Sequence, residues 1–186
     1  MIHLDAHADT APINPEFLGG GAITDGNLFT WAVVEGLVDP ERTIQIGLRG
    51  GGVGMTRRMS EDFGMRTVTM EEFEQIGVEA VVEEARRVVG EGACYLSFDT
   101  DALGSPYMQG TNLAEPFGIT DREARTFLRG LRGLDLVGAD LVETTPANDV
   151  TGASSNLAAG LAFEMLCLLA EARCERIGER RPTNWA

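Results

Sequence analysis

Short apolar runs alternate along this chain with longer segments in which apolar residues recur at helical spacing. The short runs predict strands at residues 2–5, 43–50, 66–70, 93–98 and 134–143. The longer segments predict helices at residues 27–37, 69–90, 120–131 and 155–178. Because strand and helix patterns alternate, the sequence predicts an α/β fold with a mostly parallel sheet.

Two helix starts carry a local signal in addition to the periodic one. Thr69 is followed three positions later by Glu72, and Thr120 by Glu123. A threonine and a glutamate at this spacing predict a capping box, in which each residue satisfies a free backbone N–H group of the other. Gly90 marks a predicted helix end, since glycine adopts the left-handed conformation that stops a helix.

Three stretches lack both patterns. Residues 11–27 are rich in glycine, proline and asparagine and predict a long loop, and the glycine-rich residues 47–54 predict a flexible loop. The polar residues 179–186 predict a loose tail. A chain of 186 residues, 44% of them hydrophobic, suits one cored domain, which we expect to span residues 1–178.

The charge balance narrows the range of partners. The formal net charge is −14, which argues against nucleic acid and anionic membranes, since both attract clustered Lys and Arg. An excess of acid is compatible with cations, either metal ions or a cationic substrate, and also with a surface that only aids solubility. We expect no apolar stretch of membrane-spanning length.

The cysteines and the N-terminus indicate a location. Cys94, Cys167 and Cys174 are scattered and form no Cys-x-x-Cys pair, so we expect free thiols and not a zinc ribbon or a disulfide framework. Free thiols fit a reducing compartment, and the first residues hold no basic segment followed by an apolar run, as a signal peptide would. We therefore expect a cytoplasmic protein.

Candidate chemistry gathers where two predicted strands end. The first strand runs into Asp5, His7 and Asp9, and a later one runs into Asp99 and Asp101. Ligands bind beyond the carboxyl ends of parallel strands, and alternate residues of an extended chain point to one side, so these side chains could converge. Carboxylates and an imidazole suit Mn²⁺ or a similar ion, and four clustered carboxylates favour two ions. The alternative is that each aspartate caps the turn after its strand.

Four segments form a recognisable set. They are HLDAHADT at 3–10, EGLVDPERTIQIGLRG at 35–50, SFDTDALGSPYMQGT at 97–111 and DLVETTPANDVTG at 140–152. This set resembles the motifs of the arginase and agmatinase (ureohydrolase) family, in its agmatinase branch, over roughly residues 2–170. The resemblance implies a three-layer α/β/α fold with a mostly parallel, arginase-like sheet whose N-terminal strands are missing from this chain.

The resemblance also implies a role for each candidate ligand. Asp5 and Asp99 would bridge two Mn²⁺ ions. His7 and Asp101 would complete one metal site. Asp9 would bind the other metal and hold the attacking hydroxide.

Catalysis is therefore expected to depend on Asp9 and Glu143. The resemblance assigns Glu143 to the substrate guanidinium group, which a carboxylate can bind through two hydrogen bonds. The implied reaction is hydrolysis of agmatine or a similar guanidino compound to urea and an amine. The implied partners are this small substrate and further copies of the chain in a homo-oligomer, with no nucleic acid and no membrane.

The chain departs from the family pattern at four places, and two of these concern histidines. Its only histidines are His3 and His7, whereas the family supplies a further metal-binding histidine from an upstream segment. Asp25 stands where a loop histidine is expected. Two hypotheses therefore stay open: an active binuclear manganese hydrolase, or a truncated or divergent non-catalytic homologue that acts as a metal-binding or partner subunit.

Overall fold

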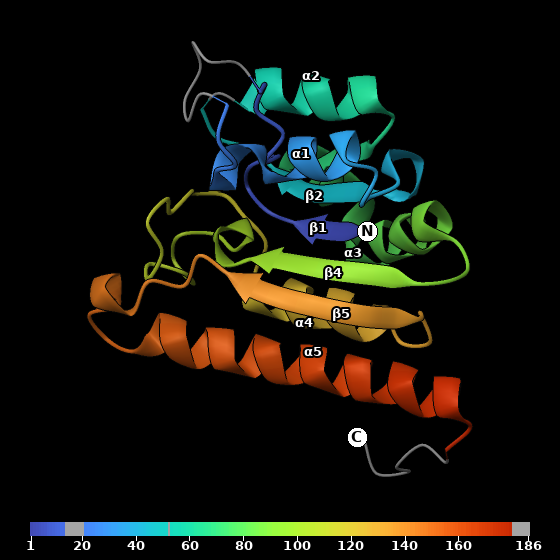
Figure 1. Cartoon of the computed structure of the whole chain (residues 1–186). Coiled ribbons are helices and arrows are strands. Elements are labelled where there is room, and N and C mark those ends of the chain that lie inside the picture. Colours follow the sequence, from blue (N-terminus) through green and yellow to red (C-terminus); the bar gives the residue numbers. More distant parts are fainter. Residues whose placement is uncertain (14–20, 52, 180–186) are drawn as a thin grey trace.

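The computed structural model describes residues 1–13, 21–51 and 53–179 (Figure 1). Its strands are β1 Ile2–Leu4, β2 Ile44–Leu48, β3 Arg66–Thr69, β4 Cys94–Asp99 and β5 Leu136–Val142. They form one sheet in the order β3-β2-β1-β4-β5, with every neighbouring pair parallel. The chain builds outward from β1 to β3 and then returns to add β4 and β5 on the other side. The order reverses between β1 and β4, which is where open α/β sheets bind ligands.

Helices lie on both faces of this sheet. In the described part of the chain they are α1 Leu28–Val34, α2 Val53–Phe63, α3 Met70–Val89, α4 Asp121–Gly130 and α5 Ala153–Ile177. Figure 1 shows α1 in front of the sheet and α3 and α4 behind it. The long helix α5 runs along β5 and also packs on α4. The expected three-layer α/β/α architecture with a parallel sheet is therefore confirmed.

The two faces of the sheet differ in polarity, because alternate residues of a strand point to opposite sides. One face carries apolar side chains that are fully buried: Ile2, Leu4, Ile44, Ile46, Leu96 and Phe98. The other face carries, at one register level, a set that we call the polar row: Thr67, Gln45, His3, Ser97 and Asp140. The apolar face joins the main core together with residues of α3, α4 and α5, and its burial favours folding.

Helices cover the polar row over the first three strands and leave it open toward β5. In α1, the Phe29 ring lies 4.5 Å from the His3 ring, measured between centroids. In α2, the Glu61 carboxylate accepts a 2.7 Å hydrogen bond from the Thr67 hydroxyl. On β4, Tyr95 is 40% exposed. The buried members of the polar row therefore lie on the face that α1 and α2 cover.

The helix α2 corrects the expectation of a flexible loop at residues 47–54. In the structure β2 continues to Leu48, and α2 begins at Val53. Ser60 is the buried residue of α2, so hydrophobic periodicity gives little signal for this helix. A polar contact fixes it instead, since the Ser60 and Thr10 hydroxyl oxygens lie 2.8 Å apart in the interior.

The helix α3 is interrupted inside the stretch for which one continuous helix is expected. Gly77 has a φ of 80° and a ψ of 160°, a conformation that glycine adopts without steric cost. At the start of α3, the Thr69 hydroxyl accepts from the Glu72 N–H at 3.2 Å, but the Glu72 carboxylate pairs with Arg66. Only half of that predicted capping box forms, whereas the box at Thr120 is complete.

The helix α5 contradicts the expectation that no stretch is long and apolar enough to span a membrane. It has 25 residues, and its most apolar window has a mean hydropathy of 1.5, so length and composition alone would allow a span. Its packing accounts for part of this composition, since Leu161, Met165 and Leu168 lie in the core, while 28% of that window is buried. In addition, Glu164 pairs with Arg129 of α4 at 2.7 Å. We therefore interpret α5 as a helix that packs on β5 and α4 with one side and leaves apolar residues exposed on the other.

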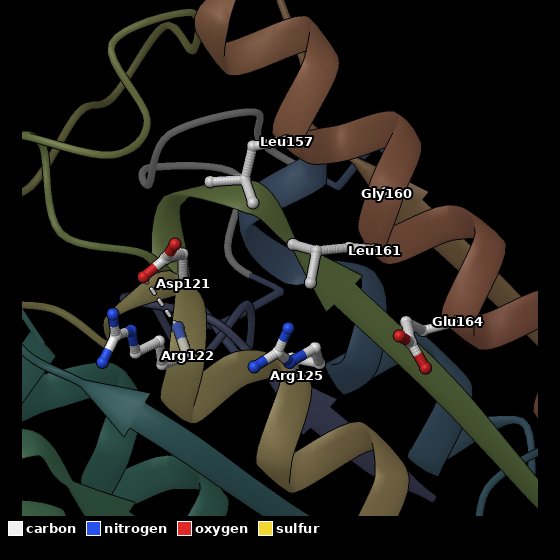
Figure 2. A pocket seen from close by; sticks show the side chains of 7 residues that line it. All are labelled: Asp121, Arg122, Arg125, Leu157, Gly160, Leu161 and Glu164. Atoms are coloured by element: carbon white, nitrogen blue, oxygen red, sulfur yellow. Dashed lines mark hydrogen bonds between the residues drawn. The ribbon is translucent and has the colours of Figure 1, made fainter. Parts of the chain in front are cut away.

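A hollow of about 440 Å³ lies between α4 and α5 (Figure 2). Its lining residues are Asp121, Arg122, Arg125, Leu157, Gly160, Leu161 and Glu164. A second hollow of about 300 Å³ lies along the same pair of helices. Neither hollow is lined by a candidate metal ligand, that is, by Asp5, His7, Asp9, Asp99 or Asp101. The candidate metal site therefore lies elsewhere.

Parts of three predicted segments lie outside the described residues. These parts are residues 14–20 of the expected loop at 11–27, residue 52 of the expected loop at 47–54 and residues 180–186 of the expected tail. The described end of the loop contains a 3-10 turn at Asp25–Asn27, which leads directly into α1.

We expect Leu96→Ala to lower the free energy of unfolding by about 2–5 kcal/mol, because it leaves a cavity in the core. Leu96 is fully buried on β4. Val150→Ala is the control, since Val150 is 97% exposed and its change should stay within about 0.5 kcal/mol. Urea denaturation followed by circular dichroism measures both variants. Equal effects of the two substitutions would contradict the burial of β4.

Candidate metal centre

The carboxyl ends of β1 and β4 lie side by side, because these two strands are paired. Asp5 follows β1, Asp99 ends β4, and a 3-10 turn at Thr100–Ala102 brings Asp101 to the same edge. All three aspartates are buried. Backbone N–H groups orient their carboxylates: that of Ala6 donates to Asp101 at 3.0 Å, and that of Asp101 donates to Asp99 at 2.7 Å.

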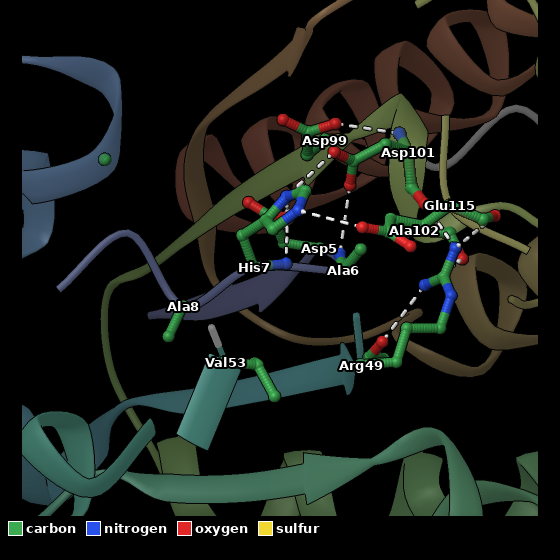
Figure 3. Close-up of polar contacts among 12 residues, drawn as sticks. Asp5, Ala6, His7, Ala8, Arg49, Val53, Asp99, Asp101, Ala102 and Glu115 are labelled. Carbon is green, nitrogen blue, oxygen red and sulfur yellow. Dashed lines mark hydrogen bonds and ion pairs between the residues drawn. The ribbon is translucent and has the colours of Figure 1, made fainter. Parts of the chain in front are cut away.

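His7 lies between two of these carboxylates (Figure 3). Its Nδ1 is 3.0 Å from Asp101 Oδ2 and 3.4 Å from Asp5 Oδ1. Its backbone N–H also donates to Asp5 Oδ1, at 2.6 Å. One ligand atom from each of these three residues lies within 4.8 Å of the other two, a spacing at which they could share one cation.

A second group shares Asp5 with the first. It consists of His3, Asp5 and Asp9, again with ligand atoms within 4.8 Å of one another. Asp9 has a φ of 51°, in the left-handed region that few residues other than glycine adopt, and its carbonyl accepts from the Phe29 N–H at 3.1 Å. The family resemblance gives His3 as a common position that is not a metal ligand, although alternation along β1 puts it on the same face as Asp5.

Glu143 follows β5 directly and so reaches the same edge of the sheet. Its neighbour Val142 is the register partner of Asp99, and the φ of Glu143 is 58°. Among the described residues, no hydrogen bond or ion pair connects Glu143 with the aspartates. Asp25 is exposed, and its carboxylate accepts locally from the Gly26 N–H at 2.9 Å.

Two further residues lie at the cluster without a clear signal in the sequence. Glu115 Oε1 is 3.8 Å from His7 Nε2, the ring nitrogen that does not face Asp101. Arg49 donates to the carbonyls of Asp101 at 2.7 Å and of Pro116 at 2.8 Å. Its planar guanidinium thereby ties Asp101 to the segment that carries Glu115, as Figure 3 shows.

Burial, like charge and hydrogen bonds make this cluster hold protons. Burial and the nearby Asp5 carboxylate raise the pKa of Asp9 to about 7 and the pKa of Asp99 to about 10. Hydrogen bonds to Asp101 and Asp5 raise the pKa of His7 to about 11. At neutral pH the cluster therefore holds protons that isolated side chains would have lost.

This donor set fits divalent cations. It offers carboxylate oxygens and an imidazole nitrogen and contains no cysteine, which suits Mn²⁺ better than structural zinc. A positive ion would also relieve the repulsion that raises the aspartate pKa values. By spacing, Asp5, His7 and Asp101 could hold one ion, and His3, Asp5 and Asp9 a second. Asp99 lies near Asp5, Asp9 and Asp101 but belongs to neither of these two groups. The roles of Asp5, His7, Asp9, Asp99 and Asp101 as ligands stay a prediction.

The parallel sheet, with a carboxylate–imidazole cluster where its strand order reverses, places this chain among α/β proteins that have a candidate metal site at the sheet's carboxyl edge. Comparison with known proteins then gives the family. The model of the Arginase family matches residues 1–167, so this chain belongs to the arginase family. The family that its four motifs resemble is thereby confirmed.

The relatives that this chain resembles carry the names of guanidino hydrolases. It is 48% identical to guanidinopropionase of Pseudomonas aeruginosa over 92% of this chain and 53% of that protein. It is 39% identical to mitochondrial agmatinase of Gallus gallus over 91% of this chain and 49% of that protein. The solved structure of proclavaminate amidino hydrolase from Streptomyces clavuligerus has a TM-score of 0.82 and 36% identity, over 92% of this chain and 56% of that one. The chain thus spans about half the length of the curated relatives that it matches.

We expect Mn²⁺ binding to release protons and to tighten as the pH rises, because ligands bind a metal in their deprotonated forms. Asp9, Asp99 and His7 would release these protons, because their raised pKa values keep them at least partly protonated near neutral pH. An indicator dye in weakly buffered solution measures the release. Asp9→Asn should reduce it near neutral pH, since it removes the group whose pKa is about 7. Binding without proton release would contradict the shifts.

The same shifts predict that the metal-free protein loses stability as the pH rises through neutrality. The folded state keeps protons on Asp9 and Asp99 that the unfolded chain would have released at lower pH. The folded state therefore binds more protons, and its stability falls with rising pH until the folded pKa values are passed. Thermal denaturation should show Mn²⁺ raising Tm more at alkaline than at acidic pH, and the opposite trend would count against this.

Proposed function

We propose that this chain forms the active site of an agmatinase-like amidinohydrolase, which binds two Mn²⁺ ions and hydrolyses a guanidino compound to urea and an amine. The main observation behind this proposal is that acidic and imidazole side chains come together at one edge of the sheet. These are the side chains of Asp5, His7, Asp9, Asp99 and Asp101. Membership of the arginase family supports the choice of reaction. So do the names of its relatives, guanidinopropionase and agmatinase.

In this proposal the bound metal, Asp9 and Glu143 would have separate roles in the reaction. Mn²⁺, when bound, would supply the Lewis acidity that makes water a nucleophile at neutral pH. Asp9 is part-exposed, unlike the buried Asp5, Asp99 and Asp101, so it is the carboxylate best able to accept a hydrogen bond from the attacking water. Glu143, at the end of β5, would pair with the substrate guanidinium through both carboxylate oxygens.

The proposed reaction forms one C–O bond and breaks one C–N bond. Water adds to the guanidinium carbon, and the bond from this carbon to the substituted nitrogen then breaks. The leaving nitrogen takes up a proton and departs as the amine. The carbon, with the oxygen from water and its two unsubstituted nitrogens, departs as urea.

The group at the far end of the substrate is a finer part of the proposal. A guanidino acid carries a carboxylate there, and agmatine carries an ammonium group, so the two need opposite charges on the protein. The identity of 48% to guanidinopropionase, against 39% to agmatinase, favours a guanidino acid. We therefore propose 3-guanidinopropionate as the first substrate to test and agmatine as the second.

A non-catalytic, metal-binding homologue is the alternative function. Two observations favour it. Asp25 stands at the expected loop histidine, is exposed and makes a local hydrogen bond. The chain also contains only two histidines, one in each candidate ligand group. Such a protein would bind Mn²⁺ and lack turnover.

We also propose that the protein is cytoplasmic and self-associates. Its three cysteines are free thiols, which suits a reducing compartment. The edge strand β5 exposes Val137, and the adjacent helix α5 exposes Leu166 and Ile177. An apolar edge strand favours pairing with another chain, and sedimentation velocity measures whether copies associate.

The direct test of the proposed function is urea release by the Mn²⁺-loaded chain. We expect urea in equal amount to the amine product from 3-guanidinopropionate, 4-guanidinobutyrate or agmatine, and none after chelation. Asp101→Asn should abolish release, whereas Glu74→Gln, an exposed acid on α3, should leave it unchanged. Mn²⁺ binding without urea from any of these substrates would refute the hydrolase and favour the non-catalytic alternative.

Glu143→Gln separates substrate recognition from metal binding. It removes the charge that would pair with the guanidinium, so we expect kcat/KM to fall about 10–100-fold, as for the loss of a charged hydrogen bond. Mn²⁺ affinity should stay within about twofold of the parent value, within the usual scatter of such comparisons. An unchanged kcat/KM would remove Glu143 from the proposed site.

A further inference from the structure

His3 could act at this site either as a metal ligand or as a hydrogen-bond donor to Asp5. It lies with Asp5 and Asp9 within 4.8 Å, as a metal ligand would, and its Nε2 is 2.9 Å from Asp5 Oδ2. That distance fits two ligands of one metal, and it fits equally a hydrogen bond from His3 to Asp5. The position of the ring proton separates the two possibilities, because a ligating nitrogen needs a free lone pair.

Gln45 fixes the position of this proton. Its Nε2 is 2.6 Å from the Ala8 carbonyl oxygen, which can only accept a hydrogen bond, so the amide nitrogen and not the amide oxygen must face it. The same Nε2 is 3.3 Å from His3 Nδ1. Its second hydrogen is then available to Nδ1, and this contact is a hydrogen bond when Nδ1 carries the lone pair.

We infer that Gln45 holds His3 as the Nε2–H tautomer, and that His3 thereby positions Asp5 for metal binding without being a ligand itself. The Nε2–H bond points to Asp5 Oδ2, and the His7 backbone N–H holds Asp5 Oδ1 at 2.6 Å. Both carboxylate oxygens of Asp5 are thus oriented, and each keeps a lone pair for a cation.

The surroundings make this arrangement rigid. Exposed fractions are 1% for His3, 0% for Gln45 and 1% for Asp5, so water does not compete for their hydrogen bonds. The Phe29 ring lies against the imidazole at 4.5 Å and 60° between the ring planes. Gln45 and His3 are register neighbours in the polar row, on β2 and β1, so backbone pairing fixes their separation.

Asp5 is the residue through which this positioning would act most strongly. It is the member that the two candidate ligand groups have in common, so its orientation affects both ions. Partners that orient a ligand in this way typically change metal affinity by about 10–100-fold when they are removed. The inference rests on the proposed Mn²⁺ site and adds the residues that prepare it.

The first test measures Mn²⁺ affinity by competition with a chelating dye. His3→Leu and Gln45→Met should each weaken binding by about 10–100-fold. His3→Gln should recover most of the loss, because a glutamine side chain can place an N–H near the position of Nε2. Ser97→Ala is the matched control: Ser97 neighbours His3 in the polar row and is also buried, but its hydroxyl donates to Asp140. Unchanged affinity in His3→Leu would overturn the inference.

The second test can be decided on the unsubstituted protein, with His3→Gln as a check, and so survives a variant that fails to fold. In the metal-free protein, nitrogen-15 NMR of His3 should show a protonated Nε2 and an unprotonated Nδ1. In the Mn²⁺-loaded protein, spin-echo modulation should count one coupled imidazole, that of His7, and the same count in His3→Gln. Two imidazoles in the parent and one in the variant, or an unprotonated Nε2, would make His3 a ligand and overturn the inference.

These tests fail separately from the proposed function. A chain that binds Mn²⁺ and releases no urea would refute the hydrolase, while the affinity series would still test the role of His3. If the chain bound no Mn²⁺, the proposed function would fail, and the tautomer measured without metal would still uphold or overturn the assignment by Gln45.

Discussion

Repulsion among buried carboxylates is the constraint on which the rest of this structure depends. Four aspartates, Asp5, Asp9, Asp99 and Asp101, meet at one edge of the sheet, and burial makes their mutual repulsion stronger than it would be in water. Without a cation, protons and the imidazole of His7 compensate part of this charge. Two divalent ions would balance four negative charges in full, and the other features of the site are ways of holding these carboxylates in place.

The sheet separates stability from chemistry between its two faces. The apolar face packs under α3, α4 and α5, and the polar row lies on the other side. Because β1 pairs with β2 and β4 in parallel, residues just past the strand ends come together without a long connection. Arg49 then fixes the loop after β4 through backbone carbonyls. Asp9 and Glu143, both with positive φ, stand at the points where the chain leaves β1 and β5.

The sequence predicted most of the fold because local signals agreed with the global pattern. The strands lie within about two residues of their expected places. Of the five candidate ligands, Asp5, His7, Asp9 and Asp101 fall into groups that could bind a metal, as alternation implied. The helix α2 could not be found by periodicity, since polar contacts such as that of Ser60 with Thr10 hold it. The roles of Gln45 and His3 depend on pairing between two strands, which no single segment reveals. Glu143 lies just past β5 at the same edge of the sheet, but among the described residues no hydrogen bond or ion pair joins it to the aspartates.

The measurement closest to the central claim is the number of Mn²⁺ ions that the protein retains per chain, by elemental analysis after loading and gel filtration. Charge balance in the cluster predicts two. In the double variant Asp5→Asn and Asp99→Asn, which removes the carboxylates shared by both proposed sites, we expect none. Retention of no Mn²⁺ by the parent protein, or the same number in parent and variant, would contradict the claim that these carboxylates exist to hold cations.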